Sequence, residues 1–265
     1  MKKIILSLLL FAVCSTQAQN GVLLVPFEDK MYRSAIDKEL GVANGKSQQD
    51  IMKNLRSGLM VQLELAFRAK YNPFSLLATD SISQASLNLC MSSTGLEYIP
   101  VKTLTIEKEN KPIGDKLKGA FGKDEKQKDG PTQSGIYKGE VVTVEDNREK
   151  YMNTVVHNPK LFSTLKNTHN NRITVFINEM DIVRENTSSP FVQQNQVDRV
   201  IKVHYTAFNE DGKEIGSGIA ESHFSGKKNK LDEIINDHLA VVAQKIYKDV
   251  LNSEETLNRL QNSGK

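Results

Sequence analysis

The sequence predicts an α/β (α+β) protein: a mixed sheet of about four or five strands packed with amphipathic helices, with an inserted flexible segment. Three observations support this fold class. A continuous apolar run opens the chain after its first twenty residues, two long segments carry an apolar stripe of helical period, and several others alternate as strands do. The proportions of hydrophobic and charged residues, 38% and 25%, are those of an ordinary globular protein.

The first half of the predicted domain spans residues 19–95. Its opening run, Gly21–Phe27, suits a strand buried on both faces. A helix is expected to begin near Ser47, and Asn72-Pro73 to stop it before a second strand at Phe74–Ala78. The stripe of this helix repeats at every fourth residue: Ile51, Leu55, Leu59, Leu63 and Phe67. Asp80 or Ser81 then caps a short helix that runs through Leu89.

The second half spans residues 158–252. Pro159 suits the first turn of a helix that ends around His169-Asn170-Asn171, and Arg172–Ile182 is the best strand candidate in the chain. Residues 201–207 alternate, and a turn at Asn209–Gly212 predicts an antiparallel hairpin with a returning strand at 215–224. An apolar stripe predicts a final helix at 229–252, and the polar tail, 253–265, is expected to fray.

Residues 96–157 separate the two halves. Lys, Glu, Asp and Gly dominate Lys108–Gly130, which predicts an inserted segment that is partly flexible. Residues 101–106 and 139–144 both partly alternate, so they are expected to form a small hairpin.

The first residues, 1–18, have the three parts of a secretory signal peptide. Lys2 and Lys3 precede an apolar core of about ten residues, and Thr16 and Ala18 are small enough to place the cut before Gln19. Cys14 leaves a lipoprotein anchor open, although Val13 stands where such signals have a small residue. The mature protein is therefore expected in the periplasm or at the periplasmic face of the outer membrane, with no transmembrane helix.

Charge and cysteine content exclude some classes of protein. The formal net charge is +3 and falls when Lys2 and Lys3 are removed with the signal, so no basic surface for nucleic acid is expected. Cys90 is then the remaining cysteine, which precludes an internal disulfide. Its apolar neighbours Leu89 and Met91 predict a buried core residue and not a reactive thiol.

No catalytic, cofactor-binding or metal-ligating residue is predicted. The five histidines, which form no zinc-binding spacing, are His157, His169, His204, His223 and His238. Two of them, His204 and His223, lie on the two arms of the predicted hairpin and could approach each other. Glu28-Asp29, directly after the first strand, is the most site-like pair of carboxylates and is interpreted as a solvated loop. The sequence contains no nucleophile-elbow motif and no phosphate-binding glycine motif after a strand. The glycines Gly212, Gly216 and Gly218 are interpreted as residues of the hairpin, where turns and bulges favour glycine.

The order of elements resembles the domain shared by curli-secretion channel lipoproteins, lipoprotein activators of penicillin-binding proteins and the N-terminal domain of TolB. The residues that carry the resemblance are Val22–Phe27 before a long helix, Phe74–Leu77 after it, a helix leading into Ile173–Ile177, the hairpin around Asp211-Gly212 and the closing helix. The resemblance covers about 150 residues and implies a non-enzymatic protein that binds envelope proteins or assembles a secretion channel.

We therefore expect a non-catalytic bacterial envelope protein that binds other proteins in a secretion or cell-wall assembly, with homo-oligomers open. The alternative is a hydrolase or small-ligand-binding periplasmic protein that uses the loops after 21–27 and 74–78. Perturbed carboxylates or histidines in a deep pocket favour this alternative, whereas an apolar patch or an exposed sheet edge favours the interaction protein. A third interpretation makes 101–144 a membrane-inserting hairpin of an oligomeric outer-membrane channel.

Overall fold

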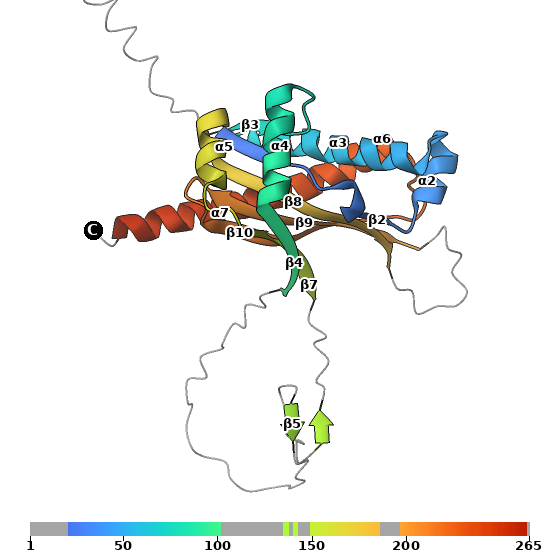
Figure 1. Cartoon of the computed structure of the whole chain (residues 1–265). Coiled ribbons are helices and arrows are strands. Elements are labelled where there is room, and N and C mark those ends of the chain that lie inside the picture. Colours follow the sequence, from blue (N-terminus) through green and yellow to red (C-terminus); the bar gives the residue numbers. More distant parts are fainter. Residues whose placement is uncertain (1–20, 102–134, 138–139, 143–148, 186–196, 264–265) are drawn as a thin grey trace, which may run out of the picture. The chain divides into compact units, whose positions relative to one another are not determined.

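A computed structural model describes residues 21–101, 135–137, 140–142, 149–185 and 197–263 (Figure 1). The chain divides into two compact units, one of residues 1–99 and 151–265 and another of residues 100–150. The predicted signal peptide with Cys14, and most of the predicted flexible insertion, lie outside the described residues. None of the described helices is long and apolar enough to cross a membrane.

The elements follow one another in mixed order. They are β1 (Gly21–Val25), η1 (Asp29–Met31), β2 (Tyr32–Ser34), α2 (Asp37–Asn44), α3 (Gln48–Phe67), β3 (Asn72–Ser75), α4 (Ser81–Ser93), β4 (Thr94–Pro100), β5 (Gly135–Tyr137), β6 (Glu140–Val142), β7 (Lys150–Val156), α5 (Leu161–His169), β8 (Asn171–Arg184), β9 (Arg199–Asn209), β10 (Glu214–Phe224), α6 (Leu231–Glu233), the π-helical segment η3 (Ile234–Leu239) and α7 (Ala240–Ser263). In the second unit, β5 and β6 pair antiparallel.

The predicted mixed sheet is confirmed. Its strands lie in the order β10-β9-β8-β1-β3, and β2 pairs with the far half of β8. β1 runs parallel to both β3 and β8, and β2 runs parallel to β8, while β9 is antiparallel to both β8 and β10. The long strand β8 is central because its first half pairs with β1 and its second half with β2.

Helices cover both faces of this sheet, as the apolar patterns require. On one face, Val22 and Leu24 of β1 pack in a large core with the buried stripe of α3 and the apolar side of α7. On the other face, Leu23 and Val25 pack in a smaller core with Cys90 of α4 and the apolar residues of α5. A strand with both faces buried reads as a continuous apolar run, which is why Val22–Val25 contains no polar residue.

Helix α3 begins where its sequence predicts. The Ser47 side chain accepts a hydrogen bond from the Asp50 N–H and caps the first turn. Further along, Gly58 allows a close approach to η3, since a Cβ at this position would lie 2.8 Å from the Ile235 side chain. Phe67 then packs edge-on against Tyr247 of α7 at a centroid distance of 5.3 Å. The helix pair therefore closes the large core.

A β-bulge in β8 determines which side chains reach the smaller core. Ile177 pairs with Tyr205 of β9, but Glu179 pairs with the next residue, His204, so Asn178 is an extra residue. The bulge shifts the alternation of side chains along β8. Up to Ile177 the residues of β8 that enter the large core are odd-numbered, whereas after the bulge they are even-numbered, namely Met180 and Ile182. Asn178 and Glu179 consequently point to the same face of the sheet.

Some boundaries differ from the sequence prediction. β3 begins at Asn72, two residues before the predicted strand, because Asn72 and Pro73 already pair with β1. The final helix continues to Ser263 and does not fray at Ser253 (Figure 1). Glu254 of this extension accepts a hydrogen bond from Tyr71 at 2.5 Å, and Lys70 lies 3.7 Å from the same carboxylate. These contacts hold the first turn of the predicted tail against the end of α3.

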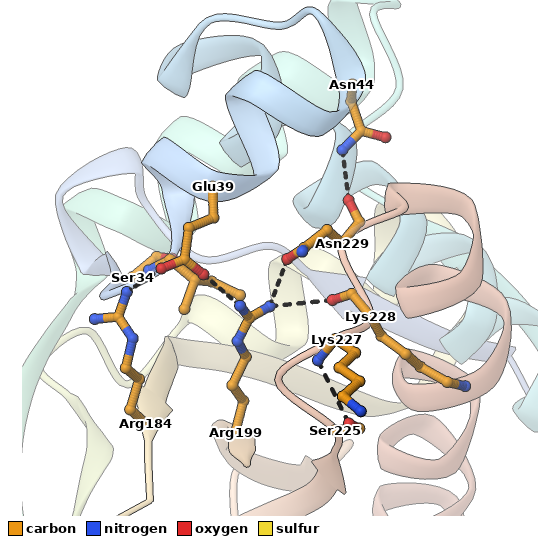
Figure 2. Close-up of polar contacts among 10 residues, drawn as sticks. Ser34, Glu39, Asn44, Arg184, Arg199, Ser225, Lys227, Lys228 and Asn229 are labelled. Carbon is orange, nitrogen blue, oxygen red and sulfur yellow. Dashed lines mark hydrogen bonds and ion pairs between the residues drawn. The ribbon is translucent and has the colours of Figure 1, made fainter. Parts of the chain in front are cut away.

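A buried arginine joins α2 to the ends of β8 and β9. Arg199 is fully buried and bonds to Glu39 of α2, which also pairs with Arg184 (Figure 2). Arg199 also donates to the Lys228 carbonyl at 3.0 Å and to the Asn229 side chain at 2.8 Å. A single guanidinium therefore connects three segments that are far apart in the sequence.

Candidate functional site

The site lies beside a two-stranded ribbon of β4 and β7, which the sequence placed in the insertion. α4 leads directly into β4 (Figure 1), and β7 is its pairing partner. The His157 N–H donates to the Ser93 carbonyl at 2.9 Å, and the Val101 N–H donates to the Glu149 carbonyl at 2.7 Å. The two bonds fit one antiparallel register without a bulge. In this register the odd-numbered residues of each strand bond to the other strand.

The sheet holds β7 by side chains instead of a strand ladder. The Met152 N–H donates to His204 Nδ1 at 2.8 Å, and the Thr154 N–H donates to Thr206 Oγ1 at 3.1 Å. The Met152 carbonyl accepts from Asn178 Nδ2 at 2.8 Å. These even-numbered peptide groups lie on the edge of β7 that faces away from β4. The ribbon therefore stands on the sheet along this edge, with β4 as its outer strand.

Thr206 is the centre of this buried network. Its hydroxyl donates to Asn153 Oδ1 at 2.7 Å and accepts from Asn178 Nδ2 at 2.8 Å as well as from the Thr154 N–H. Asn178 Oδ1 in turn accepts from the Thr154 hydroxyl at 2.6 Å. All of these side chains are buried, so the hydrogen bonds offset the cost of removing their polar atoms from water.

A pocket of about 410 Å³ lies between the ribbon and the carboxyl end of β1. It is lined by Val25 and Phe176 of the sheet, by residues of the segment after β1, and by Leu96 and Met152 of the ribbon. Three methionines line it, Met31, Met91 and Met152. Methionine side chains adapt to ligands of different shape. The carboxyl ends of parallel strands are a common position for a ligand site in α/β proteins.

A cluster of ionisable side chains lies further along β8, on the same face. The Glu179 side chain is fully buried and accepts from the Tyr98 hydroxyl at 2.8 and 2.7 Å. Arg33 of β2 lies 3.4 Å from this carboxylate. Burial, and next the hydrogen bond to Glu179, raise the pKa of Tyr98 to about 12. Tyr98 and Arg33 thus connect β4 and β2 to the centre of the sheet.

Glu179, Asp181 and His204 bring one potential metal-ligand atom each within 4.8 Å of one another. The lone pair of His204 Nδ1 is used by the Met152 N–H, which leaves the proton of the neutral ring on Nε2. Both oxygens of Glu179 accept from Tyr98. A metal ion would have to displace these hydrogen bonds, so the arrangement fits a positioning role in holding the ribbon better than a metal centre.

Asp181 makes the stability of this region depend on pH. Burial, followed by the charge of Glu179, raises the pKa of Asp181 from 3.8 to about 6. The folded state therefore binds this proton more tightly than the unfolded state, and the stability that the proton contributes is lost as the pH rises through about 6. We expect Asp181→Asn to raise the urea midpoint at pH 7.5 and to raise it by much less at pH 4.5, where most of the folded protein still carries this proton. An equal shift at both pH values would contradict this assignment.

The residues considered in the sequence occupy separate places. Glu28 lines the pocket and pairs with Lys30 at 2.9 Å, whereas Asp29 pairs with Arg56, so they do not act as a carboxylate pair. In the hairpin, His204 lies opposite Ile219. His223 lies opposite Val200, and its side chain contacts Glu185. The hairpin brings them to different neighbours, contrary to the approach we considered.

The remaining histidines, Cys90 and Gly212 that the sequence singled out serve in packing, hydrogen bonding and a turn. His238 packs on the Phe224 ring at 4.9 Å, and His169 bonds to Ser86 at 2.8 Å. Cys90 is buried, as expected, and burial raises the pKa of its thiol to about 12. Gly212 has a φ of 78° in the hairpin turn, a backbone conformation that favours glycine.

Sequence reasoning missed Tyr98, Asn178, Glu179 and Thr206. One signal was present for the β8 residues, since the apolar alternation changes phase between Ile177 and Met180. Such a change indicates a bulge, and bulges re-aim side chains. The ribbon gave no comparable signal, because β4 and β7 are separated by a long charged segment.

The fold and the site define a mixed α/β protein with a ribbon-walled pocket, and comparisons add no family to that description. No protein-family model matches the chain, and no curated protein matches it. Among solved structures, a hypothetical protein from Chlamydia trachomatis is similar with a TM-score of 0.34 and 8% sequence identity. The alignment covers 89% of this chain and 96% of that one.

Proposed function

We propose that this chain is a non-catalytic protein of the bacterial envelope that binds other proteins. The observation that supports the proposal is the outer edge of β4. In the described part of the chain, β4 pairs with β7 alone, and its other edge has no partner strand. Leu96 and Tyr98 on this strand are 37% and 45% exposed. An exposed strand edge is a common means of binding an extended segment of another protein.

The chemistry of the site supports a binding role over catalysis. Two of the three ionisable groups in the cluster are engaged in holding the ribbon: Glu179 by Tyr98, and His204 Nδ1 by the Met152 main chain. The pocket wall contributes Asn178 and Thr154, whose side chains bond to each other. Export to the envelope rests on the signal peptide predicted at 1–18.

A second candidate is the binding of a small ligand in the same pocket. Its volume, about 410 Å³, lies within the range of small-molecule sites. Its lining combines apolar residues such as Met31 and Phe176 with polar ones such as Glu28 and Asn178, which favours a ligand with both apolar and polar groups. A ligand of this kind would raise the melting temperature of the purified protein, and above its dissociation constant the stabilisation grows with the logarithm of its concentration. A screen of such compounds that raises the melting temperature would favour this candidate.

Crosslinking in intact cells tests the proposal. A photo-crosslinking amino acid is placed at each of three exposed apolar positions, Leu96, Val61 and Ile82, and the purified products are identified by mass spectrometry together with the N-terminus. We expect a stoichiometric envelope protein and a chain that starts at Gln19. Recovery of an uncrosslinked monomer from all three positions would contradict a protein-binding role.

A further inference from the structure

The proposed function leaves open which chemistry β4 recognises, and the register of the ribbon constrains it. Ser93 and Val101 bond to β7 through their main chains. By the alternation of an antiparallel ladder, the peptide groups of Thr94, Leu96 and Tyr98 point away from β7. These three residues offer alternating N–H and C=O groups to a further strand. Pro100 ends the series because it has no N–H.

Side chains alternate across the ribbon in the same way. Thr94 and Leu96 line the pocket together with Met152 and Thr154 of β7. A residue paired opposite Leu96 in an added strand would have its side chain on this pocket side. Two polar residues that line the pocket, Asn178 and Thr154, already have hydrogen-bond partners, because they bond to each other and to neighbouring groups. An apolar side chain can therefore enter without breaking a hydrogen bond.

The opposite side of the ribbon carries a charge. Glu97 is exposed and follows Leu96, so its side chain points away from the pocket side. A residue directly opposite Glu97 is favourable when it is basic and unfavourable when it is acidic. Charged residues and proline on an edge strand also oppose pairing with an identical edge. Glu97 and Pro100 thus favour a different chain over a second copy of this one.

We propose that β4 binds an extended segment of a partner protein that adds as a strand to Thr94–Tyr98 and alternates apolar with basic residues. One apolar side chain enters the pocket of about 410 Å³, and a basic side chain pairs with Glu97. This inference rests on the proposed protein-binding function and specifies its chemistry. The main-chain hydrogen bonds supply affinity, and the pocket and Glu97 supply specificity.

Binding of a defined peptide tests the inference. The probe is a fluorescent, end-capped peptide that alternates lysine with valine and leucine, measured by anisotropy against the mature protein. Leu96→Pro removes one outward N–H and leaves the β7 ladder intact, so we expect at least a tenfold loss of affinity. Leu96→Thr keeps the N–H and is expected to lose less than Leu96→Pro. Urea unfolding of both variants shows whether each is folded at the assay temperature.

Two features of the peptide separate strand addition from adsorption to an apolar or acidic surface. In an added strand, alternate N–H groups of the peptide face β4 and the others face away from it. N-methylation of the residues whose N–H groups face β4 abolishes binding, whereas N-methylation of the other set spares it. Glu97→Lys weakens the lysine peptide and strengthens a matched peptide that carries glutamate. No binding to the wild-type protein, or loss of affinity irrespective of the methylation phase, would overturn the inference.

The source of the occupant, and the proposed function itself, are tested separately. Sedimentation that shows a dimer dissociated by Leu96→Pro would assign the edge to a second copy and overturn the partner assignment. Crosslinks in cells from Val61 or Ile82 without any from Leu96 would overturn this inference and retain the protein-binding function. Crosslinks at none of these positions would overturn both.

Discussion

Replacing Arg199 with methionine is expected to lower the free energy of unfolding by about 2–3 kcal/mol, because buried hydrogen-bond acceptors lose their donor. Arg199 is fully buried, and its guanidinium bonds to Glu39, to the Asn229 side chain and to the Lys228 carbonyl. Methionine fills similar space but leaves the Lys228 carbonyl and the Asn229 side chain without this donor, while Glu39 keeps its pair with Arg184. The measurement is urea unfolding monitored by circular dichroism.

Arg184→Met is the matched control for this prediction. Arg184 pairs with the same Glu39 carboxylate, but its side chain is 28% exposed and water can replace it (Figure 2). A partly exposed pair contributes less, about 1 kcal/mol or below. Hydrogen exchange should also accelerate in α2 in the Arg199 variant, because Glu39 lies on this helix. If both variants lose the same stability, burial of Arg199 is not the cause.

The contrast between these two arginines illustrates what the sequence could predict. The strands that contain them were expected from their alternation, within a few residues of their observed bounds. Nothing in the local pattern distinguishes an arginine that is exposed from one that is buried, since the partner Glu39 is far away in the sequence. Tertiary partners of charged residues therefore lie beyond what local sequence patterns predict.

Local signals were reliable where the physical cause is local. The start of α3 near Ser47, the stripe from Ile51 to Phe67 and the turn at Gly212 each arise from residues within one or two turns of chain, and all were expected. The short elements β2 and α2 were missed. β2 has three residues and exists because it pairs with Met180–Ile182, which is a non-local contact.

The candidate site was not predicted, for a related reason. Its residues come from β4, β7 and β8, and the ribbon lies on the sheet through side-chain hydrogen bonds. Threonine, asparagine and histidine in strands resemble solvent-facing residues of a half-exposed sheet. Thr206 and His204 alternate with apolar residues of β9 in the expected manner, but the face they occupy is covered by β7.

Replacing Thr206 with valine should therefore destabilise the protein although the two side chains have nearly the same shape. The Thr206 hydroxyl accepts from the Thr154 N–H and from Asn178, and it donates to Asn153. Valine leaves these buried groups unsatisfied, at a cost of about 2–4 kcal/mol in the free energy of unfolding. Thr164→Val on the surface of α5 is the control, since its exposed hydroxyl bonds to the Lys160 carbonyl. We expect a change of no more than about 0.5 kcal/mol there.

The same variant separates a loss of overall stability from a loosening of the ribbon. In the wild type, the Met152 and Thr154 N–H groups bond to the sheet, whereas the odd-numbered residues of β7 bond to β4. Hydrogen exchange in the Thr206 variant should accelerate first at Thr154, because this amide loses its acceptor. If all amides of β7 accelerate equally, the ribbon detaches as a unit. Protection of Thr154 equal to that in the wild type would show that another group replaces the hydroxyl, and would remove Thr206 from its central place in the network.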